Sequence, residues 1–192
     1  MRRVALVLAL LLGVAACGLP SDGAPRQIAD DKVPFELLGP STTTPNTDVP
    51  GGANVRLYFL DGNPAELRAV NRSVPGRDPQ TVLNELLKGV TDSDPSGITT
   101  AIPNDTQVVK TAEDGDTLVV TLNAALLTIS DPGQKNAFGQ LVYTITDLGV
   151  TGVRFRVLDA GGVEQDVSPS TDVGQKAGPL NRGDFAQLAP KS

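Results

Sequence analysis

Three pairs of strand-like stretches, separated by two helix-like ones, restrict residues 54–167 to few architectures. The strand-like stretches alternate apolar and polar residues, whereas in the helix-like ones apolar residues recur every three or four positions. The expected order is β-β-α-β-β-α-β-β. Because each helix-like stretch carries one apolar stripe, we predict an α+β domain with a mostly antiparallel sheet and both helices packed on one face.

The strand-like stretches are short and end at turn residues. In the first, Val55, Leu57 and Phe59 share one face, so Arg56 and Tyr58 share the other. An Asp-Gly pair between the third and fourth stretches is a strong hairpin signal. The predicted strands cover residues 55–60, 67–74, 106–111, 117–122, 153–158 and 163–167, and the loop 95–103 contains a short extended piece around 98–102.

The helix-like stretches have their own start and stop signals. Asp78 followed by Pro79 predicts the beginning of the first helix, and Gly89 predicts its end. Residues 130–132, Ser-Asp-Pro, open the second helix, and Gly149 ends it. The second helix is rich in β-branched residues, so we expect packing to stabilise it.

Residues 1–16 have the composition of a secretory signal peptide. Arg2 and Arg3 precede the apolar run 4–16, which is shorter than the ~20 residues that span a bilayer. The run ends in Val-Ala-Ala and is followed by Cys17, which resembles a bacterial lipobox. We therefore predict lipidation of Cys17 and anchoring on the extracytoplasmic face of the cell membrane. The alternative is cleavage elsewhere, with Cys17 as a small apolar residue.

Segments of low apolar content flank the predicted domain. Residues 17–53 contain many Gly, Pro, Ser and Thr and cannot bury enough apolar area to offset backbone ordering, so we predict a flexible arm. Within the arm, the apolar residues 33–38 either dock on the domain or stay with the arm. Residues 168–192 show no apolar period and are predicted to form a C-terminal tail.

The composition excludes several classes of function. The chain has no His, no Trp, one Cys, two Tyr and a formal charge of −6, which becomes −8 once Arg2 and Arg3 are removed. Without His there is no Ser-His-Asp or Cys-His pair, and one Cys cannot supply a zinc ligand set. The acidic charge argues against binding nucleic acid. We predict no enzymatic activity, no metal and no cofactor.

Two acidic clusters match parts of cation-binding patterns. Asp92 and Asp94 alternate, and Gly97 follows at the spacing seen in calcium loops, but Pro103 stands where such a loop needs Glu. Residues 113–116 combine three carboxylates with the Asp-Gly pair of a hairpin. Turns are the commoner reason for both patterns, so we predict turns and no metal site.

Four residues on polar strand faces are candidates for binding a partner: Arg56, Tyr58, Arg154 and Arg156. If their two strands are neighbours, the three arginines form a row on the open sheet face. Such a row suits an anionic cell-wall polymer or an acidic partner. The alternative is a solvated face on which the arginines pair with Asp or Glu across strands.

Several short motifs in this order and spacing resemble the GerMN domain, a family named for a sporulation and spore-germination protein. They are Leu57-Tyr58-Phe59-Leu60, Leu83-x-x-Leu86-Leu87-x-Gly89, Thr100-Ala101-Ile102-Pro103-Asn104-Asp105-Thr106, Val119-Val120-Thr121-Leu122 and Gln140-Leu141-Val142-Tyr143-Thr144-Ile145-Thr146. The resemblance implies a fold similar to the ring-building motifs of secretion and sporulation assemblies, without known catalysis. The N-terminus with its lipobox resembles actinobacterial lipoproteins of the LpqB group.

The expected function is that of a membrane-anchored, non-catalytic interaction or assembly module of the cell envelope. One alternative is a binding module for an anionic cell-wall polymer. Another, which rests only on family analogy, is an accessory regulator of an envelope sensor kinase or wall enzyme. Self-association stays open at this stage, and a nucleic-acid partner is not expected.

Overall fold

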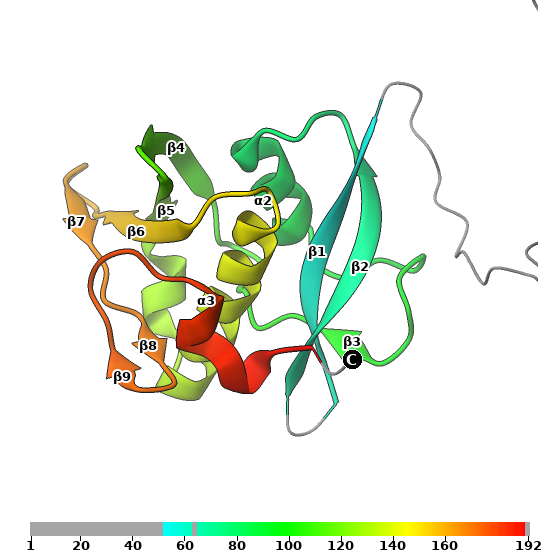
Figure 1. Ribbon diagram of the computed structural model, residues 1–192. Helices are drawn as coiled ribbons and strands as arrows, with labels where there is room; N and C mark the ends of the chain where they lie inside the picture. The colour runs from blue at the N-terminus through cyan, green and yellow to red at the C-terminus, as the bar shows by residue number, and fades with distance from the viewer. Residues whose placement is uncertain (1–51, 63–64, 191–192) are drawn as a thin grey trace, which may run out of the picture. The chain divides into compact units, whose positions relative to one another are not determined.

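The computed structural model of the chain describes residues 52–62 and 65–190 (Figure 1). The predictions about the signal peptide, Cys17 and the arm up to residue 51 lie outside these residues. The elements are β1 Ala53–Asp61, β2 Glu66–Val74, α2 Pro79–Leu87, β3 Ile98–Thr99, β4 Val108–Asp114, β5 Thr117–Asn123, the 3-10 helix η3 Ala124–Thr128, α3 Asp131–Thr146, β6 Gly152–Leu158, β7 Glu164–Asp166, β8 Ser170–Thr171, β9 Gly174–Gln175 and the 3-10 helix η4 Arg182–Leu188.

The first two strands form an antiparallel hairpin, as the sequence predicts. Each residue of β1 pairs with one of β2, from Ala53 opposite Val74 to Asp61 opposite Glu66. At the end of β1, the short strand β3 pairs with its other edge, which gives a three-stranded sheet in the order β2-β1-β3. The strand β2 is therefore one edge of this sheet.

The remaining long strands form a second sheet in the order β4-β5-β6-β7. The predicted hairpin of β4 and β5 is confirmed, and Gly115 supplies the positive φ of 59° in its turn. The predicted hairpin of β6 and β7 is confirmed as well. The pair β5 and β6 is parallel, because α3 crosses from the end of one strand back to the start of the other.

The two helices lie between the two sheets (Figure 1). The helix α3 contacts β1 on one side and β6 on the other, and α2 contacts β1 and β4. The α+β class is confirmed, but the prediction of one sheet with both helices on one face is wrong. The reason is the burial of α3, in which all nine residues from Ala137 to Ile145 are buried. A helix that is buried all round needs a layer on each side.

Local signals define both helices at the predicted positions. The Asp78 side chain accepts a hydrogen bond from the Thr81 backbone N–H at 2.9 Å, and Pro79 occupies the first turn of α2. The glycine after each helix has a positive φ, 77° at Gly89 and 101° at Gly149. In α3 the predicted stabilisation by packing replaces intrinsic propensity, since its β-branched residues are buried.

Two buried polar side chains of α3 complete the hydrogen bonding of β1. The Thr144 hydroxyl accepts from the Tyr58 backbone N–H at 3.1 Å, and the Gln140 amide donates to the Tyr58 carbonyl at 3.0 Å. The Gln140 carbonyl oxygen accepts from the Ala101 N–H at 2.8 Å. These contacts satisfy backbone groups that no strand pairs, so the motifs that resemble GerMN domains have a structural role here.

The C-terminal segment is part of the domain, which corrects the prediction of a tail from residue 168. Leu180 and Phe185 are fully buried, and Leu188 nearly so. Leu180 also forms an isolated antiparallel bridge to Val153 in β6. The segment packs closely on α3 at Gly139, where a Cβ would lie 2.5 Å from the Leu188 Cδ1 atom. The folded unit therefore extends from Ala53 at least to residue 190.

Candidate functional site

The arginine row expected from the sequence does not form. Arg56 and Tyr58 belong to β1, whereas Arg154 and Arg156 belong to β6, and these strands lie in different sheets. The physical reason is the parallel pairing of β6 with β5, with the helices between this sheet and β1. The condition for a single polymer-binding row, that the two strands are neighbours, is therefore contradicted.

The two arginines of β6 lie on its polar face, as the alternation predicts, with Val153, Phe155 and Val157 buried. Arg156 bonds to Asp166 through Nε at 2.9 Å, and this hydrogen bond raises the pKa of Arg156. Glu164 lies 3.6 Å from Arg156, and Asp114 lies 4.0 Å from Arg154. Arg154 and Arg156 therefore pair with Asp and Glu across strands, which is the alternative that the sequence left open.

Arg56 and Tyr58 instead join a group of five residues, here called the Asp147 cluster: Arg56, Tyr58, Tyr143, Asp147 and Arg182. Arg56 binds Asp147 through Nε to Oδ2 at 3.0 Å and through Nη2 to Oδ1 at 2.8 Å. Arg182 Nη2 donates to the same Oδ1 atom at 3.1 Å, and the Tyr58 hydroxyl donates to it at 3.3 Å. One carboxylate therefore holds two guanidinium groups next to each other.

Two tyrosine rings support Arg182. Its guanidinium carbon lies 5.1 Å from the Tyr143 ring centre and 5.4 Å from that of Tyr58, within cation–π range. Its Nε donates to the Thr146 hydroxyl at 2.8 Å, and Nη2 donates to the Tyr143 carbonyl at 3.1 Å. Arg182 is thus fixed in position while 40% of its side chain stays exposed.

Burial and charge have opposite effects on the two tyrosines. Burial raises the pKa of both Tyr58 and Tyr143 above the usual value, and the positive charge of Arg182 lowers it in part. Because the chain has two Tyr and no Trp, these phenols account for all tyrosine signals of the protein. The cluster therefore has its own spectroscopic reporter.

Three members of the cluster were not candidates on sequence grounds. Arg182 was missed because it lies in the segment predicted to be a tail. Asp147 is the C-cap residue of α3, where a negative charge is unfavourable beside the negative end of the helix dipole. That local conflict is a sequence signal for a compensating cation, and Arg56 and Arg182 supply two.

The geometry of the cluster suits binding rather than proton transfer. The Asp147 side chain is only 9% exposed and accepts from two arginines, so it is not positioned as a general base. Arg56 is 57% exposed, and the Nη1 atoms of both arginines have no hydrogen-bond partner among the described residues. These N–H groups can meet an anion from solution.

The acidic clusters weighed as cation sites are used in other ways. Asp94 binds Arg72, and its Oδ2 atom also accepts from the Thr91 backbone N–H at 2.6 Å, which closes the turn. The residues around Gly115 form the predicted hairpin turn. Among the described residues, no three His, Cys, Asp or Glu side chains gather as a metal site. Within the same residues, no helix has the length and apolar content to cross a membrane.

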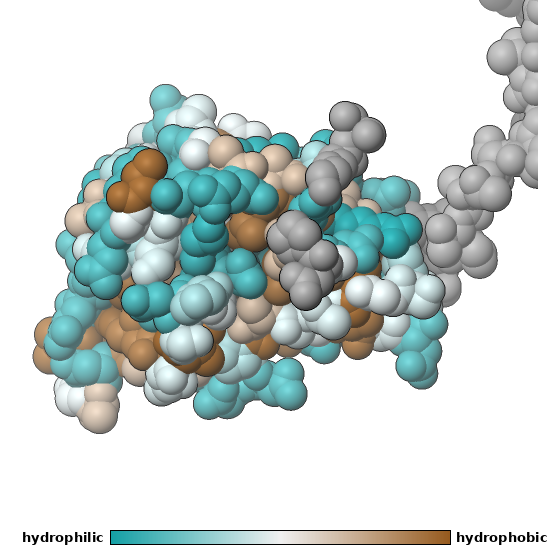
Figure 2. Space-filling view, turned by 90° about the horizontal axis from the view of Figure 1, so that it is seen from below, coloured by the Kyte–Doolittle hydropathy of each residue, from teal (hydrophilic) through white to brown (hydrophobic). Residues whose placement is uncertain are grey.

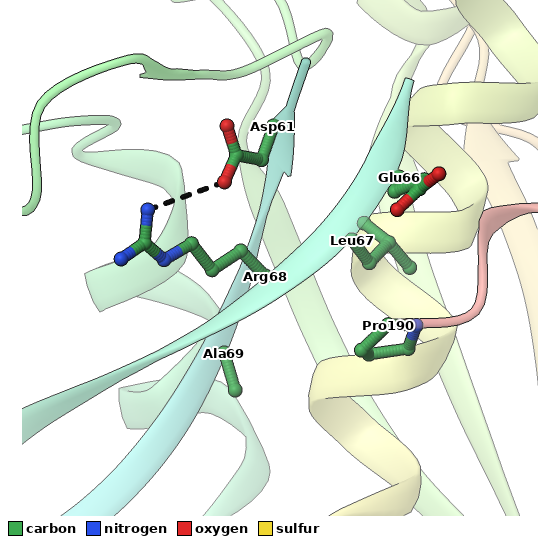
Figure 3. A pocket seen from close by; sticks show the side chains of 6 residues that line it. All are labelled: Asp61, Glu66, Leu67, Arg68, Ala69 and Pro190. Carbon is green, nitrogen blue, oxygen red and sulfur yellow. Dashed lines mark hydrogen bonds and ion pairs between the residues drawn. The ribbon is translucent and has the colours of Figure 1, made fainter. Parts of the chain in front are cut away.

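One open hollow lies beside the start of β2 and is lined by Asp61, Glu66, Leu67, Arg68, Ala69 and Pro190 (Figure 3). Its arginine points toward Asp61 and forms an ion pair with it at 3.2 Å. The apolar part of the lining comes from two short side chains and one leucine. The cation of this hollow is thus balanced by one carboxylate of its own, whereas Arg56 and Arg182 share the single carboxylate of Asp147.

Together these observations define a small α+β domain with two sheets around two helices and an exposed, aromatic-supported arginine pair. Residues 56–159 match the profile of the Germane family, described as "Sporulation and spore germination". The chain therefore belongs to this family, to which the GerMN domains are related. No curated protein matches the chain. The resemblance of the N-terminus to LpqB-type lipoproteins stays a prediction.

Two solved structures are similar to this domain. The tandem GerMN domains of the sporulation protein GerM from Bacillus subtilis match with a TM-score of 0.55 and 19% identity, over 76% of this chain and 49% of that chain. The first GerMN domain alone matches with a TM-score of 0.51 and 17% identity, over 69% and 99%. The chain thus spans about half the length of the tandem protein. At these identities the likeness establishes the fold alone.

Proposed function

We propose that this protein is a lipid-anchored component of the cell envelope whose Germane domain binds a partner and does not catalyse a reaction. The observation that carries the proposal is the Asp147 cluster. Its carboxylate is occupied by two arginines, while the arginines present N–H groups to solvent. Such a site can bind an anionic group but has no free base to move a proton.

The anchor in this proposal is Cys17. It directly follows a charged and then apolar leader whose last residues are small, and two acyl chains on one residue suffice for stable anchoring. The first strand of the domain, β1, begins at Ala53, so residues 17–52 would connect the lipid to it. The domain would then meet its partner outside the cytoplasmic membrane.

Membrane fractionation of cells that express Cys17→Ser tests the anchor. We expect the wild-type protein in the detergent phase of the membrane fraction, and the variant to lose its lipid and leave that phase. Ser21→Ala is the matched control and should fractionate as the wild type. A Cys17→Ser protein that stays in the detergent phase would contradict lipidation at this residue.

Charge reversal at two equally exposed positions tests the binding role. The side chains of Arg56 and Lys110 are both 57% exposed, but only Arg56 belongs to the cluster. After crosslinking in intact cells, we expect Arg56→Glu to abolish adducts with envelope proteins and Lys110→Glu to keep them. Equal recovery from both variants would refute the role of the cluster. Recovery of wall polymer alone would replace the protein partner with the polymer alternative.

A further inference from the structure

We propose that the Asp147 cluster binds one carboxylate group of a protein partner, an Asp or Glu side chain, through Arg56 and Arg182. This inference rests on the proposed binding function and names the chemistry of the partner. It differs from the expectation of a cell-wall polymer, because a polyanion needs several cations in line. Three features of the structure support it.

The first feature is the set of donors that the cluster leaves free. Arg56 uses the edge formed by Nε and Nη2 to bind Asp147, so the Nη1 group at its end has no partner among the described residues. Arg182 uses Nε and Nη2 for three internal acceptors, which likewise leaves Nη1. The end of Arg56 therefore keeps one N–H on Nη2 and those of Nη1, which match the planar geometry of a carboxylate, and Arg182 adds the N–H groups of its Nη1.

The second feature is preorganisation. Because Thr146, the Tyr143 carbonyl and two aromatic rings already fix Arg182, its side chain loses little further freedom when a ligand binds. Arg56 is fixed by two contacts to a carboxylate that is itself mostly buried. The side chains of the site therefore lose most of their conformational entropy when the protein folds, and little is left to lose when a ligand binds.

The third feature is the charge balance. Two arginines against Asp147 leave one excess positive charge, on a chain whose formal charge is −6. One carboxylate neutralises this excess. A repeating anion would place its next charges over an acidic protein, and the other candidate arginines, Arg154 and Arg156, lie in the other sheet beside Asp114, Glu164 and Asp166. Charge complementarity thus favours a single acidic side chain.

On the face shown in Figure 2, hydrophilic residues prevail and hydrophobic ones form separate patches. The affinity of protein–protein interfaces depends mostly on a few well-placed residues, among which arginine and aromatic residues are frequent. The Asp147 cluster combines both residue types.

A titration of the full-length lipidated protein in detergent micelles tests the proposal. The probe is acetyl-glutamate amide, which carries one carboxylate, and acetyl-glutamine amide is its uncharged control. We expect the first to shift the Nε–Hε NMR signals of Arg56 and Arg182 with a dissociation constant on the order of millimolar, and the second to leave them in place. An acetyl-glutamate amide titration that moves neither signal would overturn the proposal.

Variants connect the binding to the two arginines. Arg56→Gln should weaken the binding of acetyl-glutamate amide at least about tenfold. The matched control is Arg68→Gln, which removes another exposed arginine paired with one carboxylate and should change the affinity less than about twofold. If both variants weaken the binding equally, the effect comes from the net charge of the protein, and the proposed site is refuted.

A second variant covers the case in which loss of an arginine disturbs the fold. Arg182→Lys keeps the charge but lacks the Nη1 group that the internal contacts leave free, so we expect weaker binding with an unchanged near-ultraviolet tyrosine spectrum. Unchanged affinity in this variant would contradict the proposed contact of the Arg182 Nη1 group with the ligand. Polyphosphate and inorganic phosphate serve as competing probes, and tighter binding of either than of acetyl-glutamate amide would replace the carboxylate with a phosphate ligand.

The outcomes also separate this inference from the binding function on which it rests. If acetyl-glutamate amide fails to bind while crosslinking in cells still depends on Arg56, only the carboxylate assignment is wrong. If neither depends on Arg56, the proposed function of the cluster fails as well.

Discussion

Two arginine–aspartate clusters of this domain use the same chemistry but differ in what they leave exposed. In the first, here called the Asp94 cluster, Arg72 binds Asp94 through Nε and Nη2. Its guanidinium lies 5.1 Å from the Phe59 ring centre, much as Arg182 lies over the two tyrosines. The side chains of Arg72 and Asp94 are only 9% and 3% exposed, against 57% for Arg56 and 40% for Arg182.

The difference lies in where the donors of each arginine are used. Arg72 Nη2 also donates to the Gly89 carbonyl at 2.8 Å, and its Nη1 faces the Glu85 carbonyl at 3.4 Å and carboxylate at 3.5 Å. All three guanidinium nitrogens therefore have internal acceptors, and the cluster joins β2, α2 and the following turn. In the Asp147 cluster, by contrast, the Nη1 groups of Arg56 and Arg182 have no acceptor among the described residues. A closed cluster stabilises the fold, whereas an open one has donors left for a ligand.

The largest expected effect comes from opening the closed cluster. Arg72→Ala leaves Asp94 buried without its cation, so we expect the free energy of unfolding to fall by about 3–5 kcal/mol. Arg68→Ala, four positions earlier in β2, removes an exposed pair with Asp61 and should cost no more than about 1 kcal/mol. Chemical denaturation followed by circular dichroism measures both. Similar losses would show that burial does not separate the two kinds of arginine.

The next effect tests how the open cluster depends on the C-terminal segment. Gly139→Ala would place a Cβ 2.5 Å from Leu188 Cδ1, so we expect a loss of about 1–3 kcal/mol and displacement of the segment that carries Arg182. Gly133→Ala on the same helix meets no atom closer than 3.8 Å and should be neutral or slightly stabilising. Denaturation and the tyrosine spectrum report both. An unchanged spectrum in Gly139→Ala would contradict the close approach.

A smaller effect appears in the acid stability of the closed cluster. Burial by itself would raise the pKa of Asp94, but hydrogen bonds from Arg72 and Thr91 outweigh it and lower the pKa below the usual value. The contribution of Asp94 to stability is therefore present above the unfolded pKa of about 3.9 and lost as the pH falls through the folded value. Asp94→Asn should flatten this acid limb in denaturation curves. An equally steep limb in the variant would contradict the shift.

The smallest expected effect is a change in the tyrosine titration of the open cluster. The raised pKa of Tyr58 and Tyr143 stabilises the fold below about pH 10, and this stability is lost as the pH rises through the folded values. Because the charge of Arg182 lowers these pKa values, Arg182→Gln should raise them further if the segment stays docked. Tyrosinate absorbance measures this. A fall toward the free value would mean that the rings have lost their burial.

The sequence predicted the features that depend on neighbours along the chain. A side-chain hydrogen bond of Asp78 begins α2, and the positive φ of Gly89 ends it. The Asp-Gly turn needs only the residues beside it. The alternation that puts Arg154 and Arg156 opposite Phe155 follows from strand geometry. Each of these expectations was correct because its physical cause lies within a few residues.

The candidate site was only partly predictable, for reasons visible in its members. Arg56 and Tyr58 were chosen as an exposed pair, but Tyr58 is buried because α3 covers the second face of β1. Arg182 lies among Leu180, Phe185 and Leu188, whose spacing matches neither a strand nor a helix period. Three apolar residues spread over a loop and a short 3-10 helix leave no clear periodic signal, even though all three enter the core.

The sequence by itself determined which residue types this chain lacks, His and Trp, the positions of its helices and turns, and its membership in a family of α+β domains. These follow from residue types and short-range spacing, which the tertiary structure cannot alter. Only the tertiary structure decided that β5 and β6 run parallel, that two sheets enclose α3, and that Arg56 meets Arg182 across Asp147. Those outcomes depend on contacts between residues far apart along the chain. Arg56 and Asp147 are 91 positions apart, and Asp147 and Arg182 are 35 apart. Long-range packing of this kind is set by the whole core at once.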